Sequence, residues 1–317
     1  MVTRRPPGDP RGTRRTNAEP LTASWRLEPP PRRRPTLSVH NWRVYVIPLL
    51  IVLTVVVIVE TARSGGSSPH SGAPVATEHA PIPVFTGSGT AVLPSGPAIS
   101  QAGAGTWHIV PGSGPVIGKG PHVFRYQVAV EDGVDPASYG GDDAFARDVD
   151  ATLADPRSWI AAGTVSLQRV AAGFPKPDFV ISLTTPNTAH RPDLCGFDVR
   201  YESSCWRPSA HRIVIDLARW VRGALAFDGD LGSYRQFAIN HAIGGVFGNP
   251  QVGCGTDGGL APVMMQQDFG VADDYVHDVN QTDPTNRNRV ARDGKVCHVN
   301  AWPYPQGPGV PANNPPN

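Results

Sequence analysis

An uncharged, mostly apolar run at residues 44–59 is the feature that most constrains how this chain of 317 residues can fold. With its flanks, residues 42–62 would form about 30 Å of helix, which is enough to cross a bilayer. The run is apolar on every side, unlike the helices that cover the core of a soluble domain. The sequence therefore predicts a single-pass transmembrane helix over residues 44–62.

The charges on the two sides of this run differ. Residues 1–43 contain ten Arg and three acidic residues, whereas the rest of the chain has 18 basic and 24 acidic residues. Basic flanks stay on the cytoplasmic side, so we expect a signal-anchor in the cell membrane, with residues 1–43 cytoplasmic and the C-terminal part extracytoplasmic. A cleavable signal peptide is the alternative, but Glu60 stands where its cleavage site would need a small residue.

The composition divides the chain further. Residues 1–43 mix Arg with Pro and lack interleaved aromatic residues, which favours a disordered tail without a nucleic-acid partner. Residues 63–102 are rich in Pro, Gly and Ser, as in a flexible linker, and residues 304–317 read as a second disordered tail. One domain over residues 103–303 remains, long enough for its own hydrophobic core.

Within this domain the periodicity predicts strands and helices in the order β, α, β, β, β, α. Apolar residues alternate over residues 124–131, and a helix follows Asp142 and ends before Pro156. Three β-rich runs cover residues 164–170, 178–183 and 212–217, and a second helix begins at a predicted cap, Ser233. We expect an α+β domain with a mixed sheet and two main helices.

Four cysteines lie in this part of the chain. An oxidising compartment favours disulfides over thiols, and we predict the sequential pairing of Cys195 with Cys205 and Cys254 with Cys297. The second bond would hold down the last 60 residues, which show little regular pattern. A thiolate metal site is the alternative, but the spacing lacks paired CxxC motifs.

Residues 241–251 read HAIGGVFGNPQ. A metzincin uses HExxHxxGxxH, in which three His bind zinc, the Glu acts as general base, and a turn containing Met follows. His241 and Gly248 fit this pattern. Ala242 occupies the position of the general-base Glu, and Gly245 and Gln251 occupy the positions of the second and third His. Met264 and Met265 lie in residues 262–267, where a Met-turn would follow.

Further stretches support the same likeness. They are residues 105–107, 110–112, 150–159, 215–220, 234–236, 261–267 and 302–303. With these motifs the chain resembles an uncharacterised family of membrane-anchored actinobacterial proteins with metzincin-like, zincin-type motifs. The resemblance implies a metzincin-like extracytoplasmic domain, here with a degenerate motif.

Because three of the motif's functional residues are replaced, catalysis cannot be inferred from the resemblance. We expect no catalytic residue, no metal at the remnant positions His241, Gly245 and Gln251, and no cofactor; zinc would bind only at an atypical site. His277, His298, Asp268 and Asn249 could supply such a site, but none has the spacing of two ligands on one helical turn.

The resemblance favours a non-catalytic binding domain, a pseudoprotease, whose partner besides the membrane would be a peptide or a cell-envelope component. Two alternatives stay open: a zinc-dependent peptidase with an atypical site, and a structural cell-envelope protein. The sequence does not decide whether the chain is an enzyme, but the degenerate motif argues against enzymatic activity.

Overall fold

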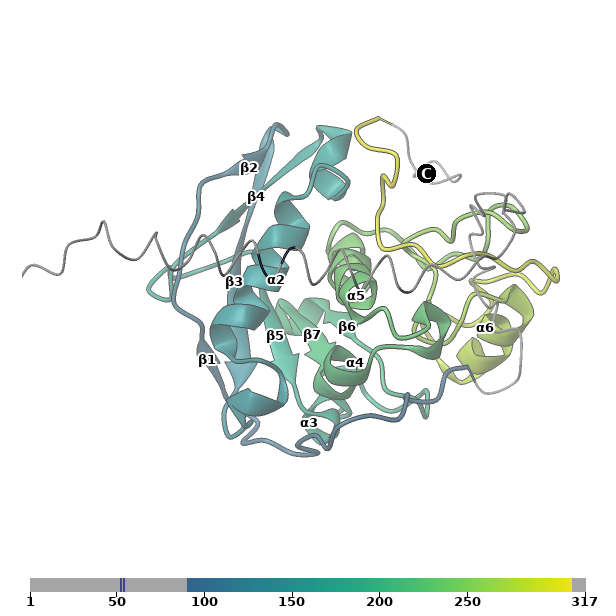
Figure 1. The fold of residues 1–317 in the computed structure, drawn as a ribbon, viewed down its shortest axis with the longest axis horizontal. Helices are drawn as coiled ribbons and strands as arrows, with labels where there is room; N and C mark the ends of the chain where they lie inside the picture. The colour runs from purple at the N-terminus through teal and green to yellow at the C-terminus, as the bar shows by residue number, and fades with distance from the viewer. Residues whose placement is uncertain (1–51, 53, 55–89, 310–317) are drawn as a thin grey trace, which may run out of the picture. The chain divides into compact units, whose positions relative to one another are not determined.

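The computed structural model of this chain describes residues 52, 54 and 90–309 (Figure 1). The segments predicted as cytoplasmic tail, membrane helix and most of the linker therefore lie outside the described residues, apart from Val52 and Thr54, and so do residues 310–317 of the predicted second tail. Within the described residues, no helix is both long and apolar enough to cross a membrane.

A seven-stranded mixed sheet forms the framework, with strand order β2-β4-β3-β5-β7-β6. Strand β3 (His122–Glu131) is central, and β4 (Val165–Arg169) and β5 (Phe179–Thr184) run parallel to it. Strand β7 (Arg212–Asp216) continues the parallel part.

Antiparallel strands complete the sheet. Strand β1 (Trp107–Ile109) pairs with the C-terminal end of β3, and β2 (Ile117–Gly118) pairs with β4. Strand β6 (Cys205–Arg207) pairs antiparallel with β7 and ends the strand order on that side. The sheet therefore has a short antiparallel strand at the edge beside β7.

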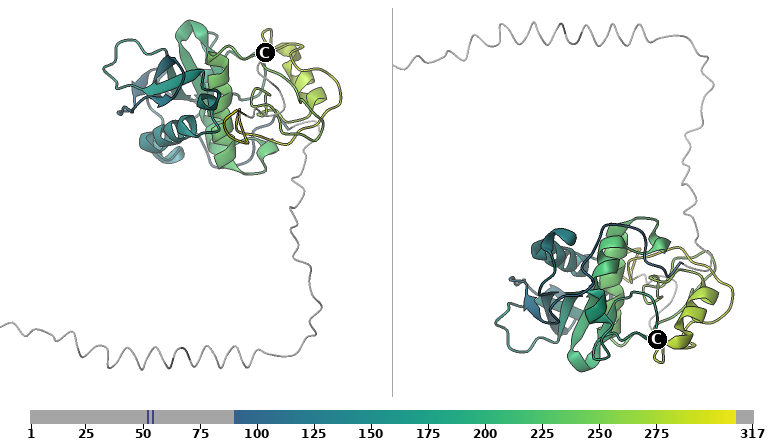
Figure 2. Two further views of the ribbon diagram at one scale, coloured as in Figure 1. Left: turned by 90° about the horizontal axis from the view of Figure 1, so that it is seen from above. Right: turned by 90° about the horizontal axis from the view of Figure 1, so that it is seen from below.

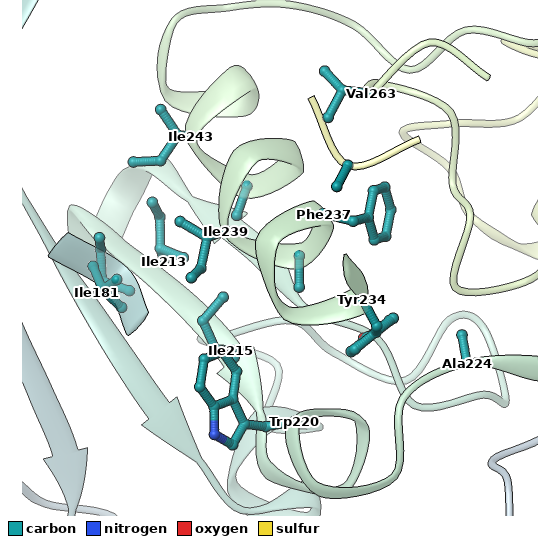
Figure 3. Packing of buried hydrophobic residues seen from close by; sticks show 14 of the residues in the cluster. Ile181, Ile213, Ile215, Trp220, Ala224, Tyr234, Phe237, Ile239, Ile243 and Val263 are labelled. Atoms are coloured by element: carbon teal, nitrogen blue, oxygen red, sulfur yellow. The ribbon is translucent and has the colours of Figure 1, made fainter. Parts of the chain in front are cut away.

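Helix α5 (Leu231–Val246) lies between the sheet and the C-terminal segment that carries α6 (Asp273–Val279), as both views in Figure 2 show. Figure 3 shows Ile239 and Ile243 on the side of Ile213, and Phe237 on the side of Val263. Because α5 is covered on both sides, all of its residues from 237 to 244 are buried, and the helix lacks the narrow apolar stripe of a surface helix.

The other helices are shorter or more exposed. Helix α2 (Asp142–Ala154) buries Phe145, Val149 and Leu153 one turn apart. Helices α3 (Pro186–Ala189) and α4 (Leu217–Arg222) follow strands β5 and β7 directly. The mixed sheet and the α+β class confirm the prediction, although several helices are present where two main ones were expected.

The sequence places the main parallel strands and α2 within a few residues, but one helix start is wrong. Helix α5 begins at Leu231, and its cap is Asp230, whose side chain accepts a hydrogen bond from the amide of Ser233 at 2.9 Å. Ser233, the predicted cap, is thus inside the helix. Both residues are good caps, and the first of them along the chain takes the role.

Both predicted disulfides are confirmed, with S–S distances of 2.09 Å for Cys195–Cys205 and 2.11 Å for Cys254–Cys297. The second bond holds the C-terminal segment, whose regular structure among the described residues is α6, a 3-10 helix at Asn280–Thr282 and bridges such as Leu260 with His298. The first ties the loop that follows α3 to strand β6.

The packed part of the chain begins earlier than residue 103. Ala91 is fully buried, and its carbonyl oxygen and that of Val92 accept hydrogen bonds from the guanidinium of Arg219, which is itself fully buried. The hydroxyl of Thr90 donates to the carbonyl oxygen of Phe269. Residues 90–102, assigned to the linker from composition, therefore include segments fixed to α4 and to the C-terminal segment.

Candidate functional site

Helix α5 carries three of the positions compared above with the metzincin motif, namely His241, Ala242 and Gly245, and Gly248 and Gln251 follow the helix. His241 and Gly245 are one turn apart, so they lie on the same side of the helix. The helix ends at Val246, and Gly248 adopts a φ of 83°, a left-handed conformation that favours glycine. The chain turns there, and the amide of Asn249 donates to the carbonyl oxygen of Gly244 at 3.0 Å.

The imidazole of His241 is held in one orientation. Its Nδ1 lies 2.9 Å from the carbonyl oxygen of Val263, and because a carbonyl only accepts, Nδ1 carries the hydrogen. Burial lowers the pKa of His241, and the charge of Asp268 opposes that shift only in part. The ring is therefore neutral at neutral pH, and its Nε2 keeps an unprotonated lone pair.

Strand β6 occupies the space beside Gly245. A Cβ atom on Gly245 would lie 3.3 Å from Cβ of Trp206 and 3.6 Å from its Cδ1. A larger side chain would meet the indole, so the helix position where the metzincin motif has its second His is closed by the edge strand.

Gly244 is needed for a different contact. A Cβ atom there would lie 2.2 Å from Sδ of Met264 and 2.7 Å from Cζ2 of Trp159. Met264 therefore packs directly on the helix backbone. Met265, the second predicted Met-turn residue, is fully buried and lies with its sulfur 4.0 Å from Sγ of Cys254.

Gln251 belongs to a chain of hydrogen bonds. Its Nε2 donates to Oε1 of Gln266, whose own Nε2 donates to Oδ2 of Asp268 at 3.2 Å. The hydroxyl of Tyr234 donates to Oδ1 of Asp268 at 2.9 Å, and Asn280 Nδ2 donates to Oε1 of Gln251 at 3.4 Å. These contacts tie the loop after α5 to residues 266–268 and to the helix itself.

A cavity of about 330 Å³ joins these residues. His241, Ala242, Gly245, Gln251 and Met264 all line it, and so do all three residues of β6. Residues 194–206 supply much of one wall, and residues 283–289 supply part of another. Among the described strands β6 pairs only with β7, so the other edge of β6 has no described strand beside it.

Further polar groups lie at or near the wall formed by residues 194–206. His190 also lines the cavity, and its Nε2 is 2.8 Å from Oε2 of Glu202. Asp216 caps α4 by accepting from the amide of Arg219 at 2.8 Å, and its other oxygen, Oδ2, has no hydrogen-bond partner among the described residues. Burial, with a smaller effect from Glu202, raises the pKa of Asp216 to about 8.

The candidate replacement ligands do not gather around His241. His277 is held by the carbonyl oxygen of Val290 at 2.8 Å, and neither His277 nor His298 lines the cavity. Asp268 is buried and bonded as described above, and only Asn249 of the four lines the cavity. In the described part of the chain, no group of three or more His, Cys, Asp or Glu side chains could hold a metal ion.

Sequence reasoning missed Trp206, Gln266 and Tyr234. Strand β6 has only three residues, too few to display an alternating pattern. Gln266 and Tyr234 lie in stretches that supported the family resemblance, residues 261–267 and 234–236, but neither was predicted to contribute to a site. The signal that could have drawn attention to Trp206 is its place next to Cys205, whose disulfide fixes that end of the strand.

The fold and the cavity define an α+β domain with a polar cavity beside an edge strand. The chain belongs to the family described as Protein of unknown function (DUF3152), whose family model matches residues 93–305. This match confirms membership of an uncharacterised family, as the sequence motifs predict. No curated protein and no solved structure matches the chain.

Proposed function

We propose that this domain is a metzincin-like pseudoprotease that binds an extended peptide segment of a cell-envelope component in the cavity along β6 without cutting it. The domain would stand outside the cytoplasm on a single-pass anchor at residues 44–62. Two disulfides are consistent with an oxidising compartment.

One observation carries the proposal. The residues at the four catalytic and metal-binding positions of the metzincin motif, which here are His241, Ala242, Gly245 and Gln251, line a single cavity together with Met264. That is the arrangement expected if the frame of a protease cleft persists while its metal ligands are lost. The loss of a positioned base alone usually costs about 10²- to 10⁴-fold in rate, so turnover is not expected.

The edge of β6 explains how a peptide would bind. An unpaired strand edge presents backbone donors and acceptors to which an extended chain can add as another strand. Cys205, Trp206 and Arg207 all line the cavity, so side chains of such a peptide would enter it. The disulfide at Cys205 fixes this edge before a ligand arrives, which lowers the ordering cost of binding.

Metal analysis tests the loss of catalysis. The intact, oxidised protein is dialysed against zinc and then against buffer, and its metal content is measured beside that of His241→Ala. We expect substoichiometric zinc in both proteins and no cleavage of a broad peptide library with or without added zinc. Stoichiometric zinc that disappears together with peptidase activity in His241→Ala would refute the proposal.

A binding measurement tests the cavity. Peptides selected from a randomised library should perturb the amide NMR signals of Cys205, Trp206 and Arg207 in the unmodified protein. Gly245→Leu should weaken binding because its side chain would press on Trp206 and displace a residue that lines the cavity. The matched control is Gly173→Leu, since nothing lies within 4 Å of a Cβ at Gly173. Binding that leaves the β6 signals and the Gly245 variant unaffected would place the ligand elsewhere.

A further inference from the structure

The buried part of the cavity wall carries no formal charge at neutral pH. Its buried lining residues are Leu194, Ser204, His241, Ala242, Met264, Gln266 and Phe269. The formally charged lining residues are Asp198, Arg207, Asp283 and Arg289, and all four are exposed or half-buried. A ligand group that reaches the floor of the cavity therefore meets hydrogen-bonding atoms without a counter-charge.

The orientation of the Gln266 amide is set by Asp268. A carboxylate only accepts hydrogen bonds, and Asp268 receives one from the hydroxyl of Tyr234 and one from Nε2 of Gln266. Burial raises the pKa of Tyr234 well above its usual value, so its hydroxyl remains a donor. With Nε2 directed to Asp268, Oε1 of Gln266 is left to accept from another residue.

That residue is Gln251, and its orientation follows in turn. Its Nε2 donates to Oε1 of Gln266, while its own Oε1 accepts from Asn280. An amide nitrogen has two hydrogens, and only one of them is used in these contacts. Gln251 lines the cavity, so it can offer the second N–H to a ligand.

His241 offers the complementary group. Its Nδ1 donates to Val263, and its Nε2 has no hydrogen-bond partner among the described residues. Gln251 thus has one N–H without a described partner and His241 has one such lone pair, and both residues line the same cavity. An uncharged group that carries both an acceptor and a donor is the kind of group that could pair with both.

We propose that the cavity floor recognises the side-chain carboxamide of a Gln or Asn residue in the bound peptide, with its oxygen accepting from Nε2–H of Gln251 and its NH₂ donating to Nε2 of His241. This inference rests on the peptide-binding function proposed above. The peptide backbone would remain at the edge of β6, and the cavity of about 330 Å³ has room for a side chain.

The structure also accounts for rejection of close analogues. Glu or Asp has the same shape but presents only acceptors, so the lone pair of His241 would face an oxygen in a site without a counter-charge. Leu would leave both polar atoms unpaired. Each replacement should weaken binding about 10- to 100-fold, the range for leaving buried polar groups unsatisfied.

The test uses ligand changes first, so that it does not depend on a variant folding. Peptides are selected from a randomised library on the intact, oxidised protein, and each Gln or Asn in the selected sequence is exchanged for Glu or Asp, Leu and Ala. We expect Gln or Asn at one fixed position, the weakening stated above, and ligand-dependent shifts of the His241 imidazole nitrogens.

A variant then tests the donor. Gln251→Glu replaces the N–H by an acceptor and should abolish the preference for the carboxamide over its Ala analogue. The matched control, Gln101→Glu, changes an exposed amide that does not line the cavity and should keep the preference.

Three outcomes overturn the inference. If neither Gln nor Asn is enriched, or if the Glu or Leu peptide binds as tightly, the floor does not select a carboxamide, although peptide binding stands. Equal binding of the Ala peptide would mean that the backbone alone fills the site. If no peptide binds at all, the proposed function and this inference fail together.

Discussion

Asp216 offers a quantitative test of how the wall beside the cavity is built. The residue is fully buried, and its pKa is raised from 3.8 to about 8, chiefly by burial. Between the ordinary pKa of an aspartate and the raised value, the folded protein thus keeps the Asp216 proton, whereas the unfolded chain has released it. A group of this kind stabilises the fold at low pH, and the contribution is lost as pH rises from about 4 towards about 8.

The size of the effect follows from the shift. Each unit of pKa difference corresponds to about 1.4 kcal/mol, so this group lowers the free energy of unfolding by about 3 kcal/mol between about pH 5 and about pH 7. Asp216→Asn removes the titration while keeping Oδ1 to cap α4. The substitution replaces Oδ2, an atom without a hydrogen-bond partner among the described residues, so no known bond is broken.

Denaturant unfolding of the oxidised protein at several pH values measures the difference between Asp216→Asn and wild type. We expect the Asn variant to gain stability relative to wild type by about 3 kcal/mol over this pH range. Asp230→Asn is the control, because Asp230 caps α5 in the same way but is exposed and has a lowered pKa. Its difference from wild type should stay nearly constant. If the stability difference between Asp216→Asn and wild type were also constant with pH, the conclusion that Asp216 is a buried, protonated carboxyl would be refuted.

Two further predictions use the same unfolding assay. Gly244→Ala should destabilise the fold by about 1–2 kcal/mol, because the clash with Met264 and Trp159 outweighs the gain in helix propensity. Gly245→Ala should instead be neutral or stabilise the fold by up to about 1 kcal/mol. If Gly245→Ala proved the more destabilising of the two, the packing described for α5 would be contradicted. Hydrogen bonds from His108 to Asp142, and to a smaller extent to Asp132, raise the pKa of His108 in the folded protein. Its contribution to the free energy of unfolding is therefore present below its unfolded pKa and is lost as pH rises through the folded pKa. His108→Gln should remove this pH dependence of stability, and an unchanged pH profile would contradict the prediction.

The sequence predicted the regular elements well because their patterns are local. The parallel strands and α2 show alternation or one-turn spacing within a few residues, and the two disulfides followed from an expected compartment and order along the chain. Strand β6 and α4 were missed, since three and six residues are too few for a period to be visible. Ser233 was mistaken for a cap because cap chemistry alone does not decide between two good candidates three residues apart.

The sequence predicted only those residues of the candidate site that lie within the motif. The pattern HAIGGVFGNPQ identified His241, Gly245 and Gln251, and all three line one cavity. It gave no sign that Trp206 closes the space beside Gly245 or that Asp268 orients Gln251 through Gln266, because these contacts join segments 15 to 39 residues apart. Such contacts depend on packing between elements, which a single sequence does not display.

The attachment of residues 90–92 has a mechanical consequence. A tensile force applied at residue 90 would act first on buried hydrogen bonds, those from Arg219 to the carbonyl oxygens of Ala91 and Val92 and that from Thr90 to Phe269. Phe269 also lines the cavity, so a force applied at residue 90 would be transmitted to the cavity wall through a single hydrogen bond. A pull on the N-terminal side and a change in the shape of the cavity would thus act on the same residue.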